Sequence, residues 1–240
     1  MAAPRGHYGC HAPRPISTSP GGSSCPSPSR TASPTTICPS RPAATSSSRL
    51  LAEARDWEER GLFKPGDADS VARNLSAAES IEQAVADADY IQEAVPEKPE
   101  IKHPVLARIE AAARRDAIIA SNTSTLPITG LATALQHSDR FLGVHFSNPA
   151  PFIPGVEIIV HPGTDAGLVP AVEELVAETG KLTARLKDSP GFVLNRLQYA
   201  LLKEAISIVD DGVASAEDVD IITRTTFGFR LPIWMQNKRK

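Results

Sequence analysis

Short apolar runs alternate with longer amphipathic segments through the middle of this chain, and this alternation most constrains the fold. Residues Ala117–Ala120 form a continuous apolar run, as expected for a parallel strand buried on both faces. Residues 98–114 show apolar side chains at helical spacing, and residues 140–146 supply another strand. Because strands and helices of this length alternate in βαβ units, the pattern predicts a doubly wound α/β sheet.

The same reading places the remaining elements. We expect further helices at 49–60, 80–88 and 166–179, and further strands at 90–96, 155–161 and 182–186. Only helices are expected after residue 187. Ser189-Pro190 would supply the N-cap and first position of a long helix. A variant of the capping box at Ser215 would start a further helix that runs through Arg224. The prediction is an incomplete, Rossmann-like parallel sheet over 49–187, followed by a truncated all-helical domain over 188–240.

Residues 1–48 differ in composition from the rest of the chain. They contain no Asp or Glu, and they hold nine of the 21 prolines and all three cysteines. Such a segment cannot bury enough apolar surface to offset its conformational entropy, so we expect it to be disordered. An organelle transit peptide is an alternative, but its amphipathic helix is disfavoured by the prolines.

Charge and cysteine usage exclude several classes of function. A net charge of -3 gives no reason to expect nucleic acid as a partner, and the chain has no run of eighteen apolar residues that would predict a membrane-spanning helix. The three cysteines lack C-x-x-C spacing, so neither a disulfide framework nor a metal site is expected. A cysteine-free folded part fits a reducing, cytoplasmic location.

Four polar residues lie at or near the ends of expected strands and helices, where α/β enzymes gather their chemistry. They are Ser124, His145, Glu157 and Asn195. Each has a structural explanation when taken alone: a turn serine, a core histidine, a surface carboxylate and an early-helix asparagine. Their occurrence together makes an active site the better interpretation.

Four ordered motifs surround these residues, namely Ala86–Glu97, Ser121–Ser124, Gly143–Pro149 and Gly191–Leu197. Through them, residues 49 to 234 resemble the 3-hydroxyacyl-CoA dehydrogenase family, including its lambda-crystallin branch, an L-gulonate 3-dehydrogenase. Four motifs in order at plausible spacing are far more specific than any one of them.

The resemblance implies an oxidoreductase of fatty acid metabolism that transfers hydride between the 3-hydroxyl carbon of an acyl-CoA and NAD. It implies that His145 is the general base and that Glu157 orients its imidazole and stabilises the protonated form. Ser124 and Asn195 would hydrogen-bond the substrate oxygen. Family members are homodimers, whereas the dimer region would be truncated here.

By the same resemblance, Ala94, Glu97, Lys102 and Asn148 would line the nicotinamide and ribose side of NAD. The pyrophosphate side should come from a G-x-G-x-x-G turn, and the sequence contains none. Residues 1–48 stand where the first strand, turn and helix of the nucleotide-binding unit would be. We therefore favour a frame error or aberrant start over a transit peptide for this segment.

The missing Gly-rich turn and the mixed character of the motifs leave two alternative functions open. Some motifs, such as Ile91–Glu93, are closer to the lambda-crystallin branch, which implies a free hydroxy acid as the small-molecule substrate in place of acyl-CoA. An inactive remnant or interaction protein that cannot bind NAD is the other alternative.

Overall fold

The computed structural model describes residues 35–37 and 43–226. The strands are β1 Thr35–Ile37, β2 Leu75–Ala77, β3 Tyr90–Glu93, β4 Ile118–Ser121, β5 Phe141–Phe146, β6 Gly155–Val160 and β7 Leu182–Lys187. The α-helices are α1 Ala43–Glu59, α2 Asp67–Asn74, α3 Ile81–Val85, α4 Pro99–Ala112, α5 Ile128–Ala132, α6 Leu168–Glu178, α7 Leu194–Asp210 and α8 Ala216–Thr226.

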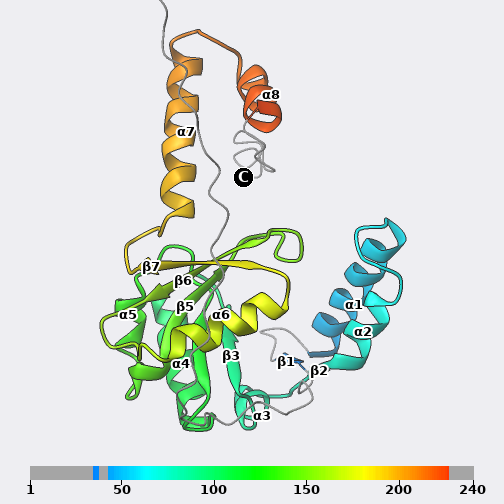
Figure 1. Ribbon diagram of the computed structural model, residues 1–240, viewed down its shortest axis with the longest axis vertical. Helices are drawn as coiled ribbons and strands as arrows, with labels where there is room; N and C mark the ends of the chain where they lie inside the picture. The colour runs from blue at the N-terminus through cyan, green and yellow to red at the C-terminus, as the bar shows by residue number, and fades with distance from the viewer. Residues whose placement is uncertain (1–34, 38–42, 227–240) are drawn as a thin grey trace, which may run out of the picture. The chain divides into compact units, whose positions relative to one another are not determined.

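The main sheet has five strands in the order β3-β4-β5-β6-β7 (Figure 1). Strands β3, β4 and β5 are parallel, but β6 pairs antiparallel with β5, and β7 pairs parallel with β6. The expectation of an all-parallel sheet was therefore wrong at one position. Residues 147–154 between β5 and β6 contain no crossover helix, and so short a connection returns the chain antiparallel.

The central strands β4, β5 and β6 are buried on both faces of the sheet, as the continuous apolar runs predict. One face packs Ile119, Phe141 and Ile159 against α4 and α5, and the other packs Ala120, Leu142 and Ile158 against α6. Adjacent strand residues thus serve opposite cores, which is the two-residue period of a strand. This arrangement confirms the α/β interpretation. Because both faces are apolar, the polar site residues lie near the ends of the strands.

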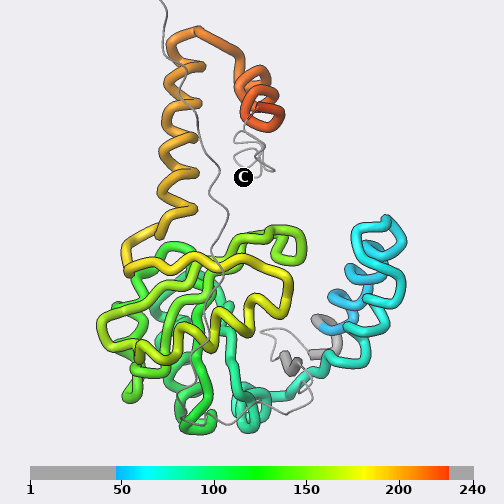
Figure 2. The backbone as a smooth tube through the Cα atoms, in the orientation of Figure 1, coloured from blue at the N-terminus to red at the C-terminus, as the bar shows by residue number. Residues whose placement is uncertain are grey.

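A helical hairpin of α1 and α2 precedes the main sheet, and the chain reverses direction between the two helices (Figure 2). The Glu58 carboxylate near the end of α1 accepts hydrogen bonds from the Gly66 and Ala68 N–H groups at 2.9 and 2.8 Å, so it caps the start of α2. Trp57 packs edge-on against Phe63 and against Phe152 of the β5–β6 connection.

Regular structure begins earlier than expected. Within residues 1–48 the structure describes 35–37 and 43–48, and these belong to β1 and to the first turns of α1. The expected disorder was wrong for these residues. The other residues of the segment, including all three cysteines, lie outside the described ranges.

The start of the long helix α7 also differs from the expectation. Gly191 and Phe192 have φ of +75° and +50°, in the left-handed region, so the chain cannot be helical there and α7 begins at Leu194. Ser189-Pro190 is consequently not its N-cap. The neighbouring Asp188 caps a different helix, accepting from the N–H groups of Ile128 and Thr129 in α5.

Ser215 caps the start of α8, where a capping box was expected, but the return contact of Asp218 goes to the serine hydroxyl, which is a variant of that motif. The Ser215 hydroxyl accepts from the Asp218 N–H at 3.1 Å and donates to the Asp218 carboxylate at 2.6 Å. Among the described helices, none combines the length and apolar character needed to cross a membrane.

Candidate active site

His145 and Glu157 face each other across the antiparallel pair β5–β6, where they are register partners. The His145 Nδ1 atom lies 2.7 Å from Glu157 Oε2. The histidine side chain is only 5% exposed, and the buried Phe192 ring lies 5.6 Å from the imidazole, centroid to centroid. Strand register therefore fixes the orientation of the imidazole.

The second oxygen of Glu157 holds the beginning of α7. Oε1 accepts from the N–H groups of Val193 and Leu194 at 3.0 and 2.9 Å. Burial by itself would raise the pKa of Glu157, but the hydrogen bonds from His145 and from these two N–H groups lower it overall. Glu157 is therefore ionised at neutral pH and joins the β-sheet to the helical region.

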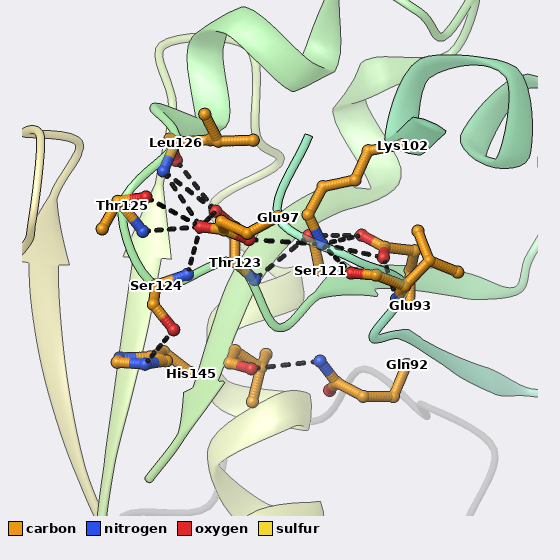
Figure 3. A network of polar contacts seen from close by, with 12 residues as sticks. Gln92, Glu93, Glu97, Lys102, Ser121, Thr123, Ser124, Thr125, Leu126 and His145 are labelled. Carbon is orange, nitrogen blue, oxygen red and sulfur yellow. Dashed lines mark hydrogen bonds and ion pairs between the residues drawn. The ribbon is translucent and has the colours of Figure 1, made fainter. Parts of the chain in front are cut away.

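Ser124 and Asn195 complete the group. The Ser124 hydroxyl points toward His145 (Figure 3) and lies 3.1 Å from its Nε2 atom. The Asn195 Nδ2 atom donates to the Ser124 carbonyl at 2.6 Å. The structure thus brings together all four residues that the motifs singled out. They come from the ends of β4, β5 and β6 and from the first turn of α7.

Glu97 closes the turn that carries Ser124. Its Oε1 atom accepts from the Thr123 hydroxyl at 2.6 Å and from the Ser124 and Thr125 N–H groups at 2.8 Å (Figure 3). Desolvation opposes ionisation, but these hydrogen bonds outweigh it and lower the pKa of Glu97 to about 2.

Lys102, also expected on the cofactor side, lies in a buried polar cluster. Its Nζ atom donates to both oxygens of Glu93 at 2.9 and 3.1 Å, and Glu93 in turn accepts from the Ser121 hydroxyl at 2.6 Å. The side chains of Lys102 and Glu93 are 1% and 0% exposed. Glu93 and Ser121 were missed from the sequence, although a carboxylate ending the buried strand β3 is a signal that could have found Glu93.

Ala94 and Asn148 are exposed, Ala94 directly after β3 and Asn148 shortly after β5. The neighbouring Asn122 joins these strand ends, because its Oδ1 atom accepts from the Phe146 N–H at 2.9 Å. The exposed amide of Asn148 and the partly exposed carboxylate of Glu97 are groups of the kind that hydrogen-bond to hydroxyl and carboxamide groups, as a ribose and a nicotinamide carry. Across residues 35–37 and 43–226, no Gly-rich turn is present to hold a pyrophosphate.

Comparison with protein-family models identifies the family of this chain. Residues 37–189 match the model of the 3-hydroxyacyl-CoA dehydrogenase NAD-binding domain, and residues 191–235 match the C-terminal domain of the same enzymes. The chain belongs to the 3-hydroxyacyl-CoA dehydrogenase family. The resemblance described from the sequence began at Arg49, whereas the matched region begins at residue 37 and so includes the start of α1.

Curated relatives in this dehydrogenase family differ in the reactions that their names state. The chain is 38% identical over 156 residues to 5-formyl-3-hydroxy-2-methylpyridine 4-carboxylate 5-dehydrogenase of Mesorhizobium japonicum, covering 65% of the chain and 50% of that protein. It is also 38% identical over 146 residues to 3-hydroxybutyryl-CoA dehydrogenase of Bradyrhizobium diazoefficiens, covering 61% and 50%. The chain thus spans about half the length of the curated relatives it matches.

Solved structures of 3-hydroxyacyl-CoA dehydrogenases and their relatives share the fold. FadB2 of M. tuberculosis superposes with a TM-score of 0.75 at 28% identity, covering 82% of this chain and 70% of that one. The (S)-3-hydroxybutyryl-CoA dehydrogenase PaaH1 of Ralstonia eutropha gives a TM-score of 0.71 at 29% identity, covering 80% and 67%. These similarities support the Rossmann-like sheet followed by a helical region.

Proposed function

We propose that this chain carries the substrate-activating site of an NAD-dependent 3-hydroxyacyl-CoA dehydrogenase, with His145 as its general base. The observation that supports the proposal most directly is the array Glu157–His145–Ser124, with contacts of 2.7 and 3.1 Å on the two imidazole nitrogens. A carboxylate, an imidazole and a hydroxyl in this order are suited to moving a proton to and from an alcohol.

The tautomer of His145 follows from its partners. An ionised Glu157 can only accept, so Nδ1 carries the proton and Nε2 carries its lone pair on the side of Ser124. Nε2 is therefore the atom that takes the proton of the substrate hydroxyl. The Glu157 carboxylate then stabilises the resulting imidazolium, as carboxylates do in other histidine–carboxylate pairs.

Ser124 and Asn195 have the supporting roles. The Ser124 hydroxyl beside Nε2 marks the place of the substrate oxygen, which it and the Asn195 amide hold by hydrogen bonds while charge develops there. When bound, NAD supplies the acceptor for the hydride that leaves the same carbon. Ala94, Glu97 and Asn148 are the residues that would line its nicotinamide and ribose side.

A free hydroxy acid is the second candidate substrate class. L-carnitine dehydrogenase of Streptomyces coelicolor is 38% identical to this chain over 148 residues, the same identity as the 3-hydroxybutyryl-CoA dehydrogenase. Identity alone therefore does not separate the two classes. Turnover measured in parallel with 3-hydroxybutyryl-CoA, L-gulonate and L-carnitine distinguishes them.

The proposal requires that the chain bind the dinucleotide and turn over a hydroxy substrate. We expect NADH to bind in a fluorescence titration with a dissociation constant in the micromolar range, about -8 kcal/mol in binding free energy. We expect His145→Gln to retain NADH binding and to lose 3-hydroxybutyryl-CoA oxidation by at least about 10²-fold. No measurable NADH binding would instead favour the inactive remnant, and unchanged turnover in His145→Gln would rule out the base assignment.

A matched control keeps the substitution interpretable. His103→Gln changes a histidine on α4 that takes no part in the array, so its turnover should equal that of the unsubstituted chain.

A further inference from the structure

The Glu97 carboxylate gathers hydrogen-bond donors from four consecutive residues, Thr123–Leu126. Besides the Thr123 hydroxyl and the N–H groups of Ser124 and Thr125, Oε1 also accepts from the Thr125 hydroxyl at 3.0 Å and the Leu126 N–H at 3.4 Å. Glu97 lies just after β3, whereas the turn follows β4. One carboxylate oxygen therefore determines the path of the turn relative to the neighbouring strand.

The position of the Ser124 hydroxyl depends on this turn. The Ser124 N–H is one of the donors to Glu97, and its side chain points from the same residue toward His145 (Figure 3). A shift of the turn would consequently move the hydroxyl away from Nε2. The Asn195 bond to the Ser124 carbonyl supports the turn from the other side.

Lys102 forms an ion pair with Glu97. Its Nζ atom lies 3.5 Å from Glu97 Oε2 and 3.0 Å from the Val95 carbonyl, in addition to its two contacts with Glu93. Two carboxylates thus share one buried ammonium, which offsets the repulsion that would otherwise separate them. The ammonium is engaged by protein groups on several sides and, at 1% exposure, offers no surface to a cofactor.

We propose that Glu97, held in place by Lys102, is a positioning residue: it fixes the turn Thr123–Leu126 and thereby sets the Ser124 hydroxyl against His145 Nε2. This inference rests on the proposed function, because it is the substrate alcohol that Ser124 and His145 would engage. It assigns Lys102 to holding the turn instead of to contacting NAD. It also gives the buried Glu93 and Ser121 a purpose, since they fix the ammonium from the opposite side.

The test uses the imidazole of His145 as the reporter, in the full chain without substrate or cofactor. The 15N chemical shift of Nε2 responds to loss of its hydrogen-bond partner, and it is read in protein labelled at histidine and assigned with His145→Gln. Ser124→Ala gives the reference position for a missing hydroxyl. Glu97→Ala removes the carboxylate, Glu97→Gln keeps an accepting oxygen, and Glu100→Ala is the control, an exposed glutamate in the first turn of α4.

We expect the Nε2 signal of Glu97→Ala to move to the position seen in Ser124→Ala, that of Glu97→Gln to move part of the way, and that of Glu100→Ala to stay in place. A general loss of stability would lower the melting temperature without displacing this one signal. An Nε2 signal unchanged in Glu97→Ala, while displaced in Ser124→Ala, would overturn the inference.

NADH affinity and turnover separate this inference from the proposed function. If Glu97 positions Ser124, kcat of Glu97→Ala falls by about 10²-fold even at saturating NAD, the penalty of a misplacement near 1 Å. The double variant Ser124→Ala/Glu97→Ala should then lose no more than Ser124→Ala alone. Weaker NADH binding with full kcat at saturating NAD and with the Nε2 signal in place would show that Glu97 acts only as a cofactor contact and would contradict the inference. Absence of all turnover in the unsubstituted chain would refute the proposed function alone, because the Nε2 measurement needs neither substrate nor cofactor.

Discussion

Glu157 illustrates how one side chain can serve both chemistry and architecture. One of its oxygens orients His145, and the other accepts from the first N–H groups of α7. Because the two oxygens belong to one rigid group, the imidazole and the helix cannot be placed independently. The site and the helical region are therefore joined by a single residue.

Replacing this carboxylate by an amide should impair catalysis more than stability. In Glu157→Gln an amide N–H can face Nδ1, which favours the wrong histidine tautomer and moves the proton to Nε2. We expect kcat to fall by about 10²- to 10⁴-fold, as for the matching change in other histidine–carboxylate pairs. Steady-state turnover with 3-hydroxybutyryl-CoA measures the effect, with Glu173→Gln, a surface glutamate on α6, as control. Equal kcat in both variants would remove Glu157 from the mechanism.

Ionisation of Glu97 makes the free energy of unfolding depend on pH in the acidic range. Its pKa in the folded chain is about 2, below the ordinary value of 4.5, so its contribution is complete above pH 4.5 and is lost as the pH falls toward 2. The unfolding free energy of Glu97→Gln should thus lie below that of the unsubstituted chain at neutral pH, and the difference should shrink between those two values. Urea denaturation at stepped pH measures it, and a difference independent of pH would contradict the assignment.

At the scale of elements, the close approach of α5 to β5 depends on a glycine. A Cβ atom added at Gly143, in the centre of β5, would meet the Ile128 Cδ1 and Cγ1 atoms of α5 at 2.7 and 2.9 Å. We expect Gly143→Ala to cost about 1–3 kcal/mol, typical of overpacking in a core. Ile128→Val removes the nearest of these atoms, so it should restore part of the loss. Urea unfolding of both single variants and the double variant tests this, and additive losses would argue against the contact.

Most helices and strands could be predicted from the sequence, whereas one helix start and one strand direction were missed. The strands β3, β4 and β5 and helices α4 and α6 were predicted because apolar periodicity is local information. The left-handed backbone at Phe192 has no such signal, so the start of α7 was placed too early. The strand β6 was expected, but its antiparallel direction was missed, although the short 147–154 connection contained the necessary information.

For the candidate site too, the sequence predicts residue types but not their arrangement in space. Ser124, His145, Glu157 and Asn195 were found because motifs preserve residue types at given spacings, and the structure brings them together. Their geometry, in contrast, depends on pairings between distant segments. The burial of Lys102 between two carboxylates could not be read from an ordinary-looking helix face.

At the scale of the whole molecule, the helical region exposes apolar side chains. Leu197 and Tyr199 on α7 and Ile222 on α8 are 60%, 64% and 56% exposed. Large apolar side chains that are exposed to this extent favour association.

We therefore expect the sedimentation coefficient of the chain to rise with protein concentration. The double variant Leu197→Lys/Tyr199→Lys should reduce that rise. Leu182→Lys, at an apolar position on β7 that is 73% exposed, should leave it unchanged. A sedimentation coefficient independent of concentration in all three proteins would show that this surface does not associate.

The pairing of His145 with Glu157 across β5 and β6 has a consequence for how such sites can vary. Strand register, and not the path of residues 147–154, holds the two residues opposite each other. The connection can therefore change in length and sequence without disturbing the proton-transfer pair, provided that the register is kept. This separation allows new loops to be grafted between a base and its carboxylate while the pairing of the two is kept.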